Sequence, residues 1–213
     1  MLHKQTVLES TLDLLKKIQA LSNMSGMRLV GGTALALQLG HRVSVDLDIF
    51  GKWNYAEDLQ SALSDVGHVE KESGTPSGGM AFFYIDGVKV DCVAYDMYRW
   101  LEQPVEVDGV RLARVKDIAA MKVNAITNRG TRKDFVDMAR LLDDYSLADM
   151  FAWYLEKYPA ANPALAMRSM SYFVDAETMP MPRMLVPFDW DEAKARICTA
   201  VRKLVMSAGG HRG

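Results

Sequence analysis

The sequence predicts an α+β fold, in which a mixed sheet with flanking helices is followed by an all-α helical part. Two Asp-Gly pairs, at residues 86–87 and 108–109, separate runs of alternating apolar residues and are typical of tight β-hairpin turns. After Arg114 the strand patterns stop, and the remaining segments have the spacing of amphipathic helices. A chain of 213 residues is long enough for both parts. We therefore expect one domain at residues 1–113 and a helical domain at residues 114–213.

The elements of the first part follow from hydrophobic spacing and from breaker residues. Leu8, Leu12, Leu15 and Ile18 recur at helical intervals, and a run of good helix formers follows Thr33. The expected helices are about Lys4–Asn23, Thr33–Leu39 and Tyr55–Val66. The expected strands are Met27–Val30, Ser44–Phe50, Ala81–Ile85, Val88–Val93, Pro104–Val107 and Val110–Ala113, with a loop at Glu72–Gly79.

The second part is predicted to be helical throughout. A segment with three prolines, Thr178–Pro187, is expected to be a linking loop because proline interrupts a helix. The expected helices are Lys116–Asn128, Arg132–Tyr145, Leu147–Lys157, Pro163–Phe173 and Asp191–Ser207.

Composition excludes several classes of protein. The chain has 25 Lys and Arg against 27 Asp and Glu, and 49% of its residues are hydrophobic, which argues against disorder and against a nonspecific nucleic-acid coat. No apolar run approaches the roughly 18 residues that a membrane helix needs, and the N-terminus has the pattern of an amphipathic helix, not of a signal peptide. The two cysteines, Cys92 and Cys198, stand in apolar contexts and suit a reducing cytoplasm.

Two aspartates alternate with apolar residues in the predicted strand Ser44–Phe50. Asp46 and Asp48 are two residues apart, so their side chains should leave the same face about 6.6 Å apart along the backbone. Asp91 has a polar position in the strand Val88–Val93, and the three carboxylates converge within about 5–8 Å if the two strands pair. Such a cluster favours a bound Mg²⁺ or Mn²⁺. An isolated Asp-x-Asp pair is, by contrast, typical of a solvated edge strand.

A glycine pair stands at the predicted junction between a strand and a helix. Gly31 and Gly32 would let the backbone approach a ligand closely, and the N-terminal amides of a helix attract anions. The hydroxyl of Thr33 could donate to a phosphate, although an ordinary N-cap after a glycine turn has the same pattern. One helix and one turn return the chain from Thr33 to Asp46, so we expect a phosphate cradle beside the metal site.

A third group of charged residues spans the predicted junction of two helices in the second part. Lys122 and Arg129 could hold triphosphate oxygens, with Asp134 and Asp137 orienting the two cations. Thr131 and Asp134 also fit a capping box, in which Asp134 would simply begin a helix. The two interpretations are compatible.

Three blocks of sequence carry a family resemblance. They are GGTALALQLGHRVSVDLDIF at 31–50, KVDCV at 89–93 and MKVNAITNRGTRKDFVDMARLL at 121–142. Together they resemble the AbiEii/AbiGii-type nucleotidyltransferases, a toxin branch of the DNA polymerase β-like nucleotidyltransferase superfamily. The resemblance spans about residues 27–145, and the first block is the most specific. The chain from Tyr145 onward carries no motif that we can assign.

The resemblance implies a nucleotidyltransferase core with a helical C-terminal domain, and roles for particular residues. It implies that Asp46 and Asp48 are Mg²⁺ ligands, with Asp91 as a third carboxylate that varies between branches of the superfamily. Lys122 matches the motif lysine and Asp134 the aspartate of the lysine–aspartate segment, so the catalytic set is Asp46, Asp48, Asp91, Lys122 and Asp134. With the charge pattern above, the expected nucleotide-binding residues are Gly31, Gly32, Thr33, Arg42, Ser44, Lys122 and Arg129.

These residues predict a cytoplasmic enzyme that moves a nucleoside monophosphate from an NTP to an acceptor hydroxyl, with Mg²⁺ or Mn²⁺ as cofactor. The family implies that the acceptor is RNA, with tRNA ends as targets in one branch. It also implies a toxin of a toxin–antitoxin or phage-defence system, with a separate antitoxin protein as partner. The short apolar runs predict no membrane association. A small molecule or a protein hydroxyl remains an alternative acceptor. An inactive nucleotide-binding regulatory partner is a further alternative, against which the carboxylate pair and the glycine turn argue.

An RNA acceptor would need a basic surface. The candidate basic residues are Arg111, Arg114, Lys116, Arg129, Arg132, Lys133, Arg196, Arg202 and Lys203. Scattered surface charge has the same composition, so salt-dependent affinity for tRNA is the observation that distinguishes the two interpretations.

Overall fold

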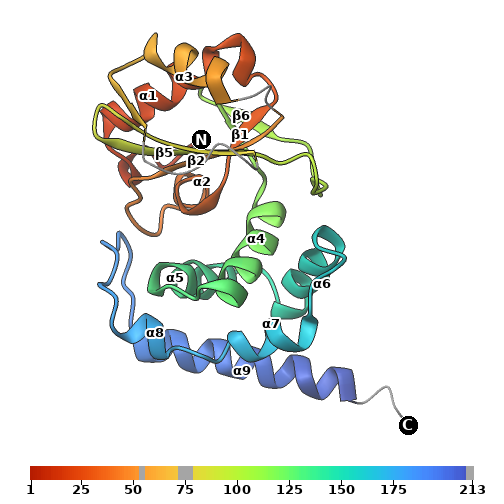
Figure 1. Ribbon diagram of the computed structural model, residues 1–213. Helices are drawn as coiled ribbons and strands as arrows, with labels where there is room; N and C mark the ends of the chain where they lie inside the picture. The colour runs from red at the N-terminus through yellow and green to blue at the C-terminus, as the bar shows by residue number, and fades with distance from the viewer. Residues whose placement is uncertain (53–55, 72–78, 210–213) are drawn as a thin grey trace. The chain divides into compact units, whose positions relative to one another are not determined.

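The fold is described from a computed structural model, which describes residues 1–52, 56–71 and 79–209 (Figure 1). The chain divides into two compact units, Met1–Arg114 and Val115–Gly213, and each is described by itself. Within the described ranges, no helix is both long enough and apolar enough to cross a lipid bilayer. Most of the predicted loop Glu72–Gly79 lies outside the described residues, as does Tyr55 at the start of a predicted helix.

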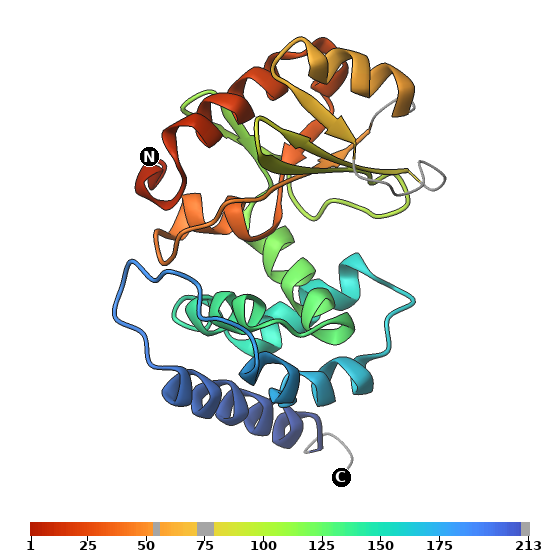
Figure 2. The same cartoon turned by 60° about the vertical axis from the view of Figure 1, so that its left-hand side comes forward.

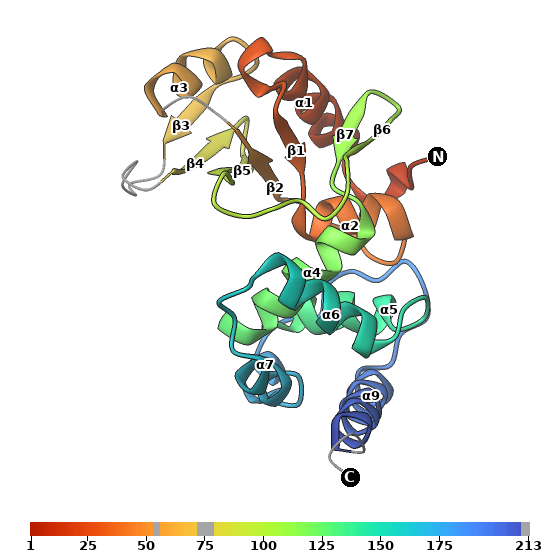
Figure 3. The same ribbon diagram turned by 90° about the vertical axis from the view of Figure 1, so that its right-hand side faces the viewer.

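The first unit is built on a mixed seven-stranded sheet in the order β3-β4-β5-β2-β1-β7-β6 (Figure 3). The β2–β5 and β1–β7 pairs are parallel, and the other neighbours are antiparallel. The strands are β1 (Met27–Leu29), β2 (Leu47–Gly51), β3 (Val69–Lys71), β4 (Met80–Ile85), β5 (Val88–Ala94), β6 (Val105–Val107) and β7 (Val110–Leu112). The sequence did not predict β3, whose three residues are too few to show an alternating pattern.

Helices lie on both sides of this sheet. Figures 1 and 2 show α1 (Glu9–Ala20) and α3 (Ala56–Ser64) on one side, and Figure 1 shows α2 (Gly31–Leu39) on the other. The predicted first helix is shorter than expected, because Leu8 and Leu21 at its two ends have extended backbone. Separate 3₁₀ turns, η1 (Lys4–Thr6) and η2 (Ser22–Met24), lie before and after it.

The two faces of the central strands differ sharply in polarity. On one face, apolar side chains such as Leu29, Ile49 and Cys92 are fully buried. On the opposite face, Asp48 and Asp91 are only half-buried, as the alternating pattern predicts. The sheet therefore presents a buried face to the core and an accessible face that carries the predicted carboxylates.

One strand boundary differs from the prediction. The strand expected at Ser44–Phe50 begins only at Leu47, and Val45 is 58% exposed although the alternation assigned it to the core. The residues just before Leu47 form a loop that folds back onto the start of α2, where Thr33 donates a hydrogen bond to Ser44. Asp46 therefore lies at the entrance of β2 and not within it.

Both predicted hairpins are confirmed. Asp86 and Gly87 join β4 to β5 with φ angles of 49° and 77°, and Asp108 and Gly109 join β6 to β7 with 55° and 76°. Two successive residues with positive φ are the signature of the hairpin turns that match the twist of a sheet.

The second unit contains α4 (Val115–Asn128), α5 (Arg132–Leu141), α6 (Leu147–Lys157), α7 (Pro163–Ser169), α8 (Val174–Glu177) and α9 (Trp190–Gly209). Helix α4 packs against α5, α6 and α7, and α9 packs against α5 and α6. Two predicted helices are too long: the one expected to reach Tyr145 ends at Leu141, and the one expected to reach Phe173 ends at Ser169. The predicted proline-containing loop is confirmed between α8 and α9.

Candidate functional site

The turn between β1 and α2 brings the backbone against the side chain of Asp48. Gly31 has a φ of +67°, which favours glycine, and a Cβ atom there would collide with Asp48 Oδ2. Helix α2 begins at Gly31, with the extended Val30 as its N-cap and no side-chain cap. The prediction that Thr33 begins or caps this helix is therefore wrong. The first N–H groups of a helix have no acceptor within the helix, so this terminus can bind an anion.

Thr33 anchors the loop that precedes β2. Its hydroxyl donates to Ser44 Oγ at 2.8 Å and also contacts the carbonyl oxygen of Asp46. The Ser44 N–H donates to the carbonyl oxygen of Thr6, 2.8 Å away, which ties the same loop to η1. Thr33 is only 1% exposed, so its hydroxyl is buried against the loop before β2 and does not face solvent. The hydroxyl that the sequence assigned to a phosphate thus fixes the position of Asp46.

Arg42 lies beneath the glycine turn. Its side chain is buried, and its Nη1 donates to the carbonyl oxygen of Val43 at 3.0 Å. A Cβ atom on Gly32 would collide with the Arg42 guanidinium. The second glycine of the pair is therefore required for the close approach of this arginine. Ser44 remains half-buried beside the turn.

The carboxylates of Asp48 and Asp91 lie on neighbouring strands. In the parallel pairing of β2 with β5, Asp48 is directly opposite Asp91. The strand pairing on which the sequence prediction depended is therefore present. Asp46 joins this pair from the loop end, two residues before Asp48.

Lys89 supplies positive charge to the same face. Its Nζ lies 2.7 Å from Asp91 Oδ2, in an ion pair that is partly exposed. Burial acts to lower the pKa of Lys89, but the hydrogen bond to Asp91 and the charges of Asp91, Asp46 and Asp48 outweigh it and raise the pKa. The ammonium group is therefore charged at neutral pH, and the negative charges of all three carboxylates stabilise it.

The three aspartates do not form a ready-made metal site. Within the ranges that the structure describes, no group of three or more His, Cys, Asp and Glu side chains could hold a metal ion. The expected convergence of Asp46, Asp48 and Asp91 is therefore incomplete, because Asp46 lies outside the strand and Lys89 holds one oxygen of Asp91. The donor chemistry still suits a hard cation, since Asp91 Oδ1 is buried and has no hydrogen-bond partner among the described residues.

A buried ion cluster in the second unit contains the other predicted residues. Lys122 Nζ on α4 lies 2.9 Å from Asp134 Oδ1 and 2.5 Å from Asp137 Oδ2, both on α5. The two carboxylates are fully buried and the lysine side chain is 5% exposed. Arg129 Nε lies 3.2 Å from Asp134 Oδ2. The structure therefore brings Lys122, Arg129, Asp134 and Asp137 together, as the sequence predicted.

The predicted capping box at the start of α5 is also present. The Thr131 side chain and the Asp134 side chain each accept from the backbone of the other residue. Burial acts to raise the pKa of Asp134, but the charges of Lys122 and Arg129 and the hydrogen bonds from Thr131 and Lys122 lower it to about 2. Asp134 is therefore both a helix cap and the centre of an ion cluster, and its part in holding a triphosphate stays a prediction.

Comparison with known proteins assigns the chain to a family. Residues 13–200 match the family described as "Nucleotidyl transferase AbiEii toxin, Type IV TA system". The chain belongs to the AbiEii nucleotidyltransferase toxin family. The resemblance carried by the three sequence blocks is thereby confirmed, and the protein is a nucleotidyltransferase of a toxin–antitoxin family.

One sequence relative and two solved structures are similar to this AbiEii protein. An uncharacterized protein of Aquifex aeolicus (strain VF5) is 32% identical over 170 residues, which cover 76% of this chain and 81% of the relative. The crystal structure of JHP933 from Helicobacter pylori has a TM-score of 0.56 at 17% identity, covering 97% of this chain and 100% of that one. MenT4, a nucleotidyltransferase toxin from Mycobacterium tuberculosis, has a TM-score of 0.53 at 12% identity, covering 90% and 80%. At such identities, the two structures show a shared fold.

Sequence reasoning missed a second buried ion pair in this AbiEii chain. Lys157 Nζ on α6 lies 2.7 Å from Asp117 Oδ1 on α4, and both side chains are fully buried. Forty positions separate the two residues, and each alone looks like a surface residue of an amphipathic helix. Only the packing of α4 against α6 brings them together, so no local pattern could have identified the pair.

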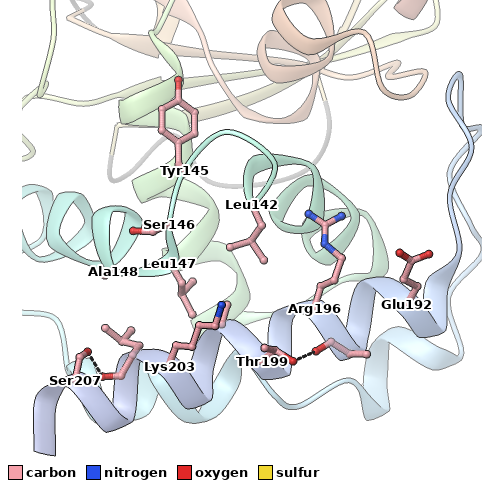
Figure 4. A pocket seen from close by; sticks show the side chains of 13 residues that line it. Leu142, Tyr145, Ser146, Leu147, Ala148, Glu192, Arg196, Thr199, Lys203 and Ser207 are labelled. Atoms are coloured by element: carbon pink, nitrogen blue, oxygen red, sulfur yellow. Dashed lines mark hydrogen bonds between the residues drawn. The ribbon is translucent and has the colours of Figure 1, made fainter. Parts of the chain in front are cut away.

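A pocket of about 650 Å³ opens in the second unit of this AbiEii chain, between α9 and the start of α6 (Figure 4). Arg196 and Lys203 of α9 and Tyr145 are among the side chains that line it. Arg196 donates to Asp143 at 2.5 Å, so part of its charge is already compensated. The predicted catalytic and nucleotide-binding residues do not line this pocket.

Proposed function

We propose that this protein is a Mg²⁺-dependent enzyme that transfers a nucleoside monophosphate from an NTP to an acceptor hydroxyl and releases pyrophosphate. The single observation that carries the proposal is the placement of Asp48 against both Asp91 and Gly31. Carboxylates suited to a divalent cation and a helix N-terminus suited to phosphate meet there on the accessible face of the sheet.

Asp46, Asp48 and Asp91 are the residues that would hold the metal ion. When bound, the cation would supply positive charge that offsets the negative charge developing on the triphosphate during transfer. Two features support this assignment: Asp91 Oδ1 has no hydrogen-bond partner among the described residues, and the Asp-x-Asp pair supplies hard oxygen donors. Mn²⁺ has the same ligand preference and is the expected substitute.

The chain's own groups account for the remaining steps. The acceptor oxygen attacks the α-phosphorus of the NTP, the bond from that phosphorus to the oxygen bridging the β-phosphate breaks, and pyrophosphate leaves with the electron pair. We assign the proton of the acceptor hydroxyl to the Asp91 carboxylate. The backbone at Gly31 and Gly32 binds phosphate oxygens, while Thr33, Arg42 and Ser44 position the loop that carries Asp46.

We further propose that residues 1–113 form the catalytic core and that residues 114–213 form a separate helical domain. In the second unit, Lys122 and Asp134 take the parts that the family resemblance implies, in support of charge neutralisation during transfer. Their burial in one ion cluster with Asp137 gives them a fixed geometry. Arg129 has a side chain that is 61% exposed, and it is the member of this cluster that we propose as a nucleotide-binding residue.

RNA, and tRNA in particular, is the acceptor that we propose. Basic residues on α9, Arg202 and Lys203, are exposed, and Lys203 also lines the pocket of Figure 4. Positive charge of this kind contacts phosphates without reading bases. The type IV family description implies an antitoxin as partner, which we propose to be a separate protein. An enzyme that uses NTP and RNA works where both are found, so we propose a cytoplasmic location.

Incubation with α-³²P-labelled NTPs, Mg²⁺ and total RNA tests the proposal, followed by identification of the labelled species. We expect label in RNA, release of unlabelled pyrophosphate, and no reaction in EDTA. Label found only in protein or in small molecules would contradict the RNA acceptor and keep nucleotidyl transfer. No label in any fraction, with each NTP and with either metal, would contradict the proposed function.

A further inference from the structure

A row of aromatic rings begins beside the carboxylates. Phe50 follows Asp48 by two residues on β2, so both side chains lie on the same face about 6.6 Å apart along the strand. The ring centroids of Phe50 and Tyr95 lie 5.4 Å apart, and those of Tyr95 and Tyr98 lie 4.9 Å apart. Tyr95 is only 6% exposed, whereas Tyr98 is 47% exposed. The row therefore starts near the proposed metal site and ends in an accessible ring.

The segment that carries these rings is held in place from β1. The Arg28 guanidinium stacks on Trp100 at 3.9 Å from the ring centroid, and its Nη1 donates to the carbonyl oxygen of Glu102 at 3.2 Å. The Trp100 ring in turn lies 4.9 Å from that of Tyr95. Figure 3 shows the chain between β5 and β6 running along the side of the sheet on which α2 lies. The Trp100 ring, held by the stacked guanidinium, packs on Tyr95, and Tyr95 packs on Tyr98. These contacts restrict the motion of Tyr98 more than is usual for an exposed residue in a loop.

Strand register places three kinds of group in one order along the sheet. Because β1 and β2 are antiparallel, Gly31 lies at the Asp48 end, and Arg28 lies directly opposite Phe50. The order is therefore the helix N-terminus, the carboxylates, and the aromatic rings. A nucleotide has its phosphates at one end and a flat base at the other, with a sugar between them. The polarity of the face matches the polarity of that ligand.

We propose that Tyr98, supported by Tyr95 and Trp100, forms the stacking surface for the nucleobase of the NTP. This inference rests on the proposed nucleotidyl transfer and adds the subsite that binds the base. Every base has a π-face, so stacking binds without reading hydrogen-bond patterns. The subsite therefore contributes affinity and orientation, and it discriminates weakly among the four NTPs.

Equilibrium binding of ATP and of inorganic tripolyphosphate by calorimetry, with Mg²⁺ and without an acceptor, tests the inference. We expect Tyr98→Ala to weaken ATP binding about 5- to 100-fold, the range for loss of one base–aromatic stack. Tripolyphosphate has no base, so its affinity should not change. Tyr98→Phe keeps the ring and should bind ATP like the wild type.

Tyr84→Ala is the matched control, because Tyr84 is an exposed tyrosine on the same sheet, opposite Lys89 and away from the ring row. It should bind both ligands normally. Unchanged ATP affinity in Tyr98→Ala, an equal loss in Tyr84→Ala, or an equal loss of tripolyphosphate would each overturn the stacking surface. An effect of Tyr98→Ala on RNA affinity alone would also overturn it, in favour of an acceptor base. A wild-type protein that binds neither ATP nor tripolyphosphate would instead overturn the proposed function itself.

Discussion

Asp48 of β2 and Asp91 of β5 are direct neighbours across a parallel strand pair, with both side chains on the accessible face of the sheet. Like charges opposite each other on strands are destabilising, and the ion pair of Lys89 with Asp91 offsets part of this cost. An arrangement that costs stability is typical of a site where the excess charge binds a ligand.

Replacement of Asp48 by Asn should reduce nucleotidyl transfer by at least ~1,000-fold, because a metal ligand worth several kcal/mol in the transition state is lost. The amide has the same shape as the carboxylate, so the fold should remain intact. Asp13→Asn, on the exposed face of α1, is the matched control and should keep full activity. Incorporation of label from α-³²P-NTP measures both variants. Wild-type activity in Asp48→Asn would remove this residue from the mechanism.

Gly31→Ala should impair transfer far more than it impairs folding. The left-handed backbone costs an alanine about 1–2 kcal/mol, and the added Cβ also collides with the Asp48 carboxylate. Gly87→Ala has a similar backbone cost at a φ of +77°, but a Cβ there would have no atom of the described residues within 4 Å. Urea unfolding should therefore show similar losses of stability in the two variants, while only Gly31→Ala loses activity. Equal activities would show that close approach at Gly31 is unimportant.

Much of the accessible face was predictable because it depends on local patterns. Alternation placed Asp48 and Asp91 on polar faces, and the Asp-Gly turns fixed the β4–β5 hairpin that contains Asp91. The prediction failed at Val45 and Thr33, where a tertiary contact decides the backbone. Thr33 bonds the loop before β2, and that contact shortens the strand and draws the threonine inside. Propensity and period alone contain no information on such a contact.

The aromatic row and the second buried ion pair were beyond sequence reasoning for a related reason. Tyr95, Tyr98 and Trp100 have no periodic spacing, and the cation that lies over Trp100 comes from Arg28 of a distant strand. The cluster around Lys122 was predictable because a capping box and a helical repeat keep its members within sixteen positions in the sequence.

Lys89→Met should make the protein more dependent on divalent cations for stability. The raised pKa of Lys89 means that its stabilising charge is fully present at neutral pH and is lost only as the pH rises above its ordinary value of 10.5. Removing it at neutral pH takes the ammonium partner from Asp91 and a nearby positive charge from Asp46 and Asp48. We expect the melting temperature in EDTA to fall by about 2–4 °C, and added Mg²⁺ to restore more of it than in the wild type. Equal Mg²⁺ effects in both proteins would contradict a metal site at these carboxylates.

Asp134 should make the second unit sensitive to acid. Its folded pKa of about 2 lies below the ordinary 3.8, so the unfolded chain binds more protons between these values. The resulting stabilisation, about 2 kcal/mol, is present above pH 4 and is lost as the pH falls toward 2. Urea unfolding of wild type and Asp134→Asn should therefore differ most near neutral pH and converge on acidification. A difference that stays constant down to pH 3 would contradict this linkage.

Lys122 and Lys157 offer a matched test of whether the motif lysine does more than stabilise the helices. Both are buried on or against α4 and paired with buried aspartates, but only Lys122 belongs to the family motif. Replacing either by Met removes an ammonium group from buried carboxylates, two beside Lys122 and one beside Lys157, which should cost about 3–5 kcal/mol in each case. At a temperature where both variants remain folded, transfer per folded molecule should fall in Lys122→Met and stay normal in Lys157→Met. Lys122→Arg keeps the charge and should recover more stability than activity, because a planar guanidinium does not replace a compact ammonium between two carboxylates. Equal activities per folded molecule in the two methionine variants would assign Lys122 to structure alone.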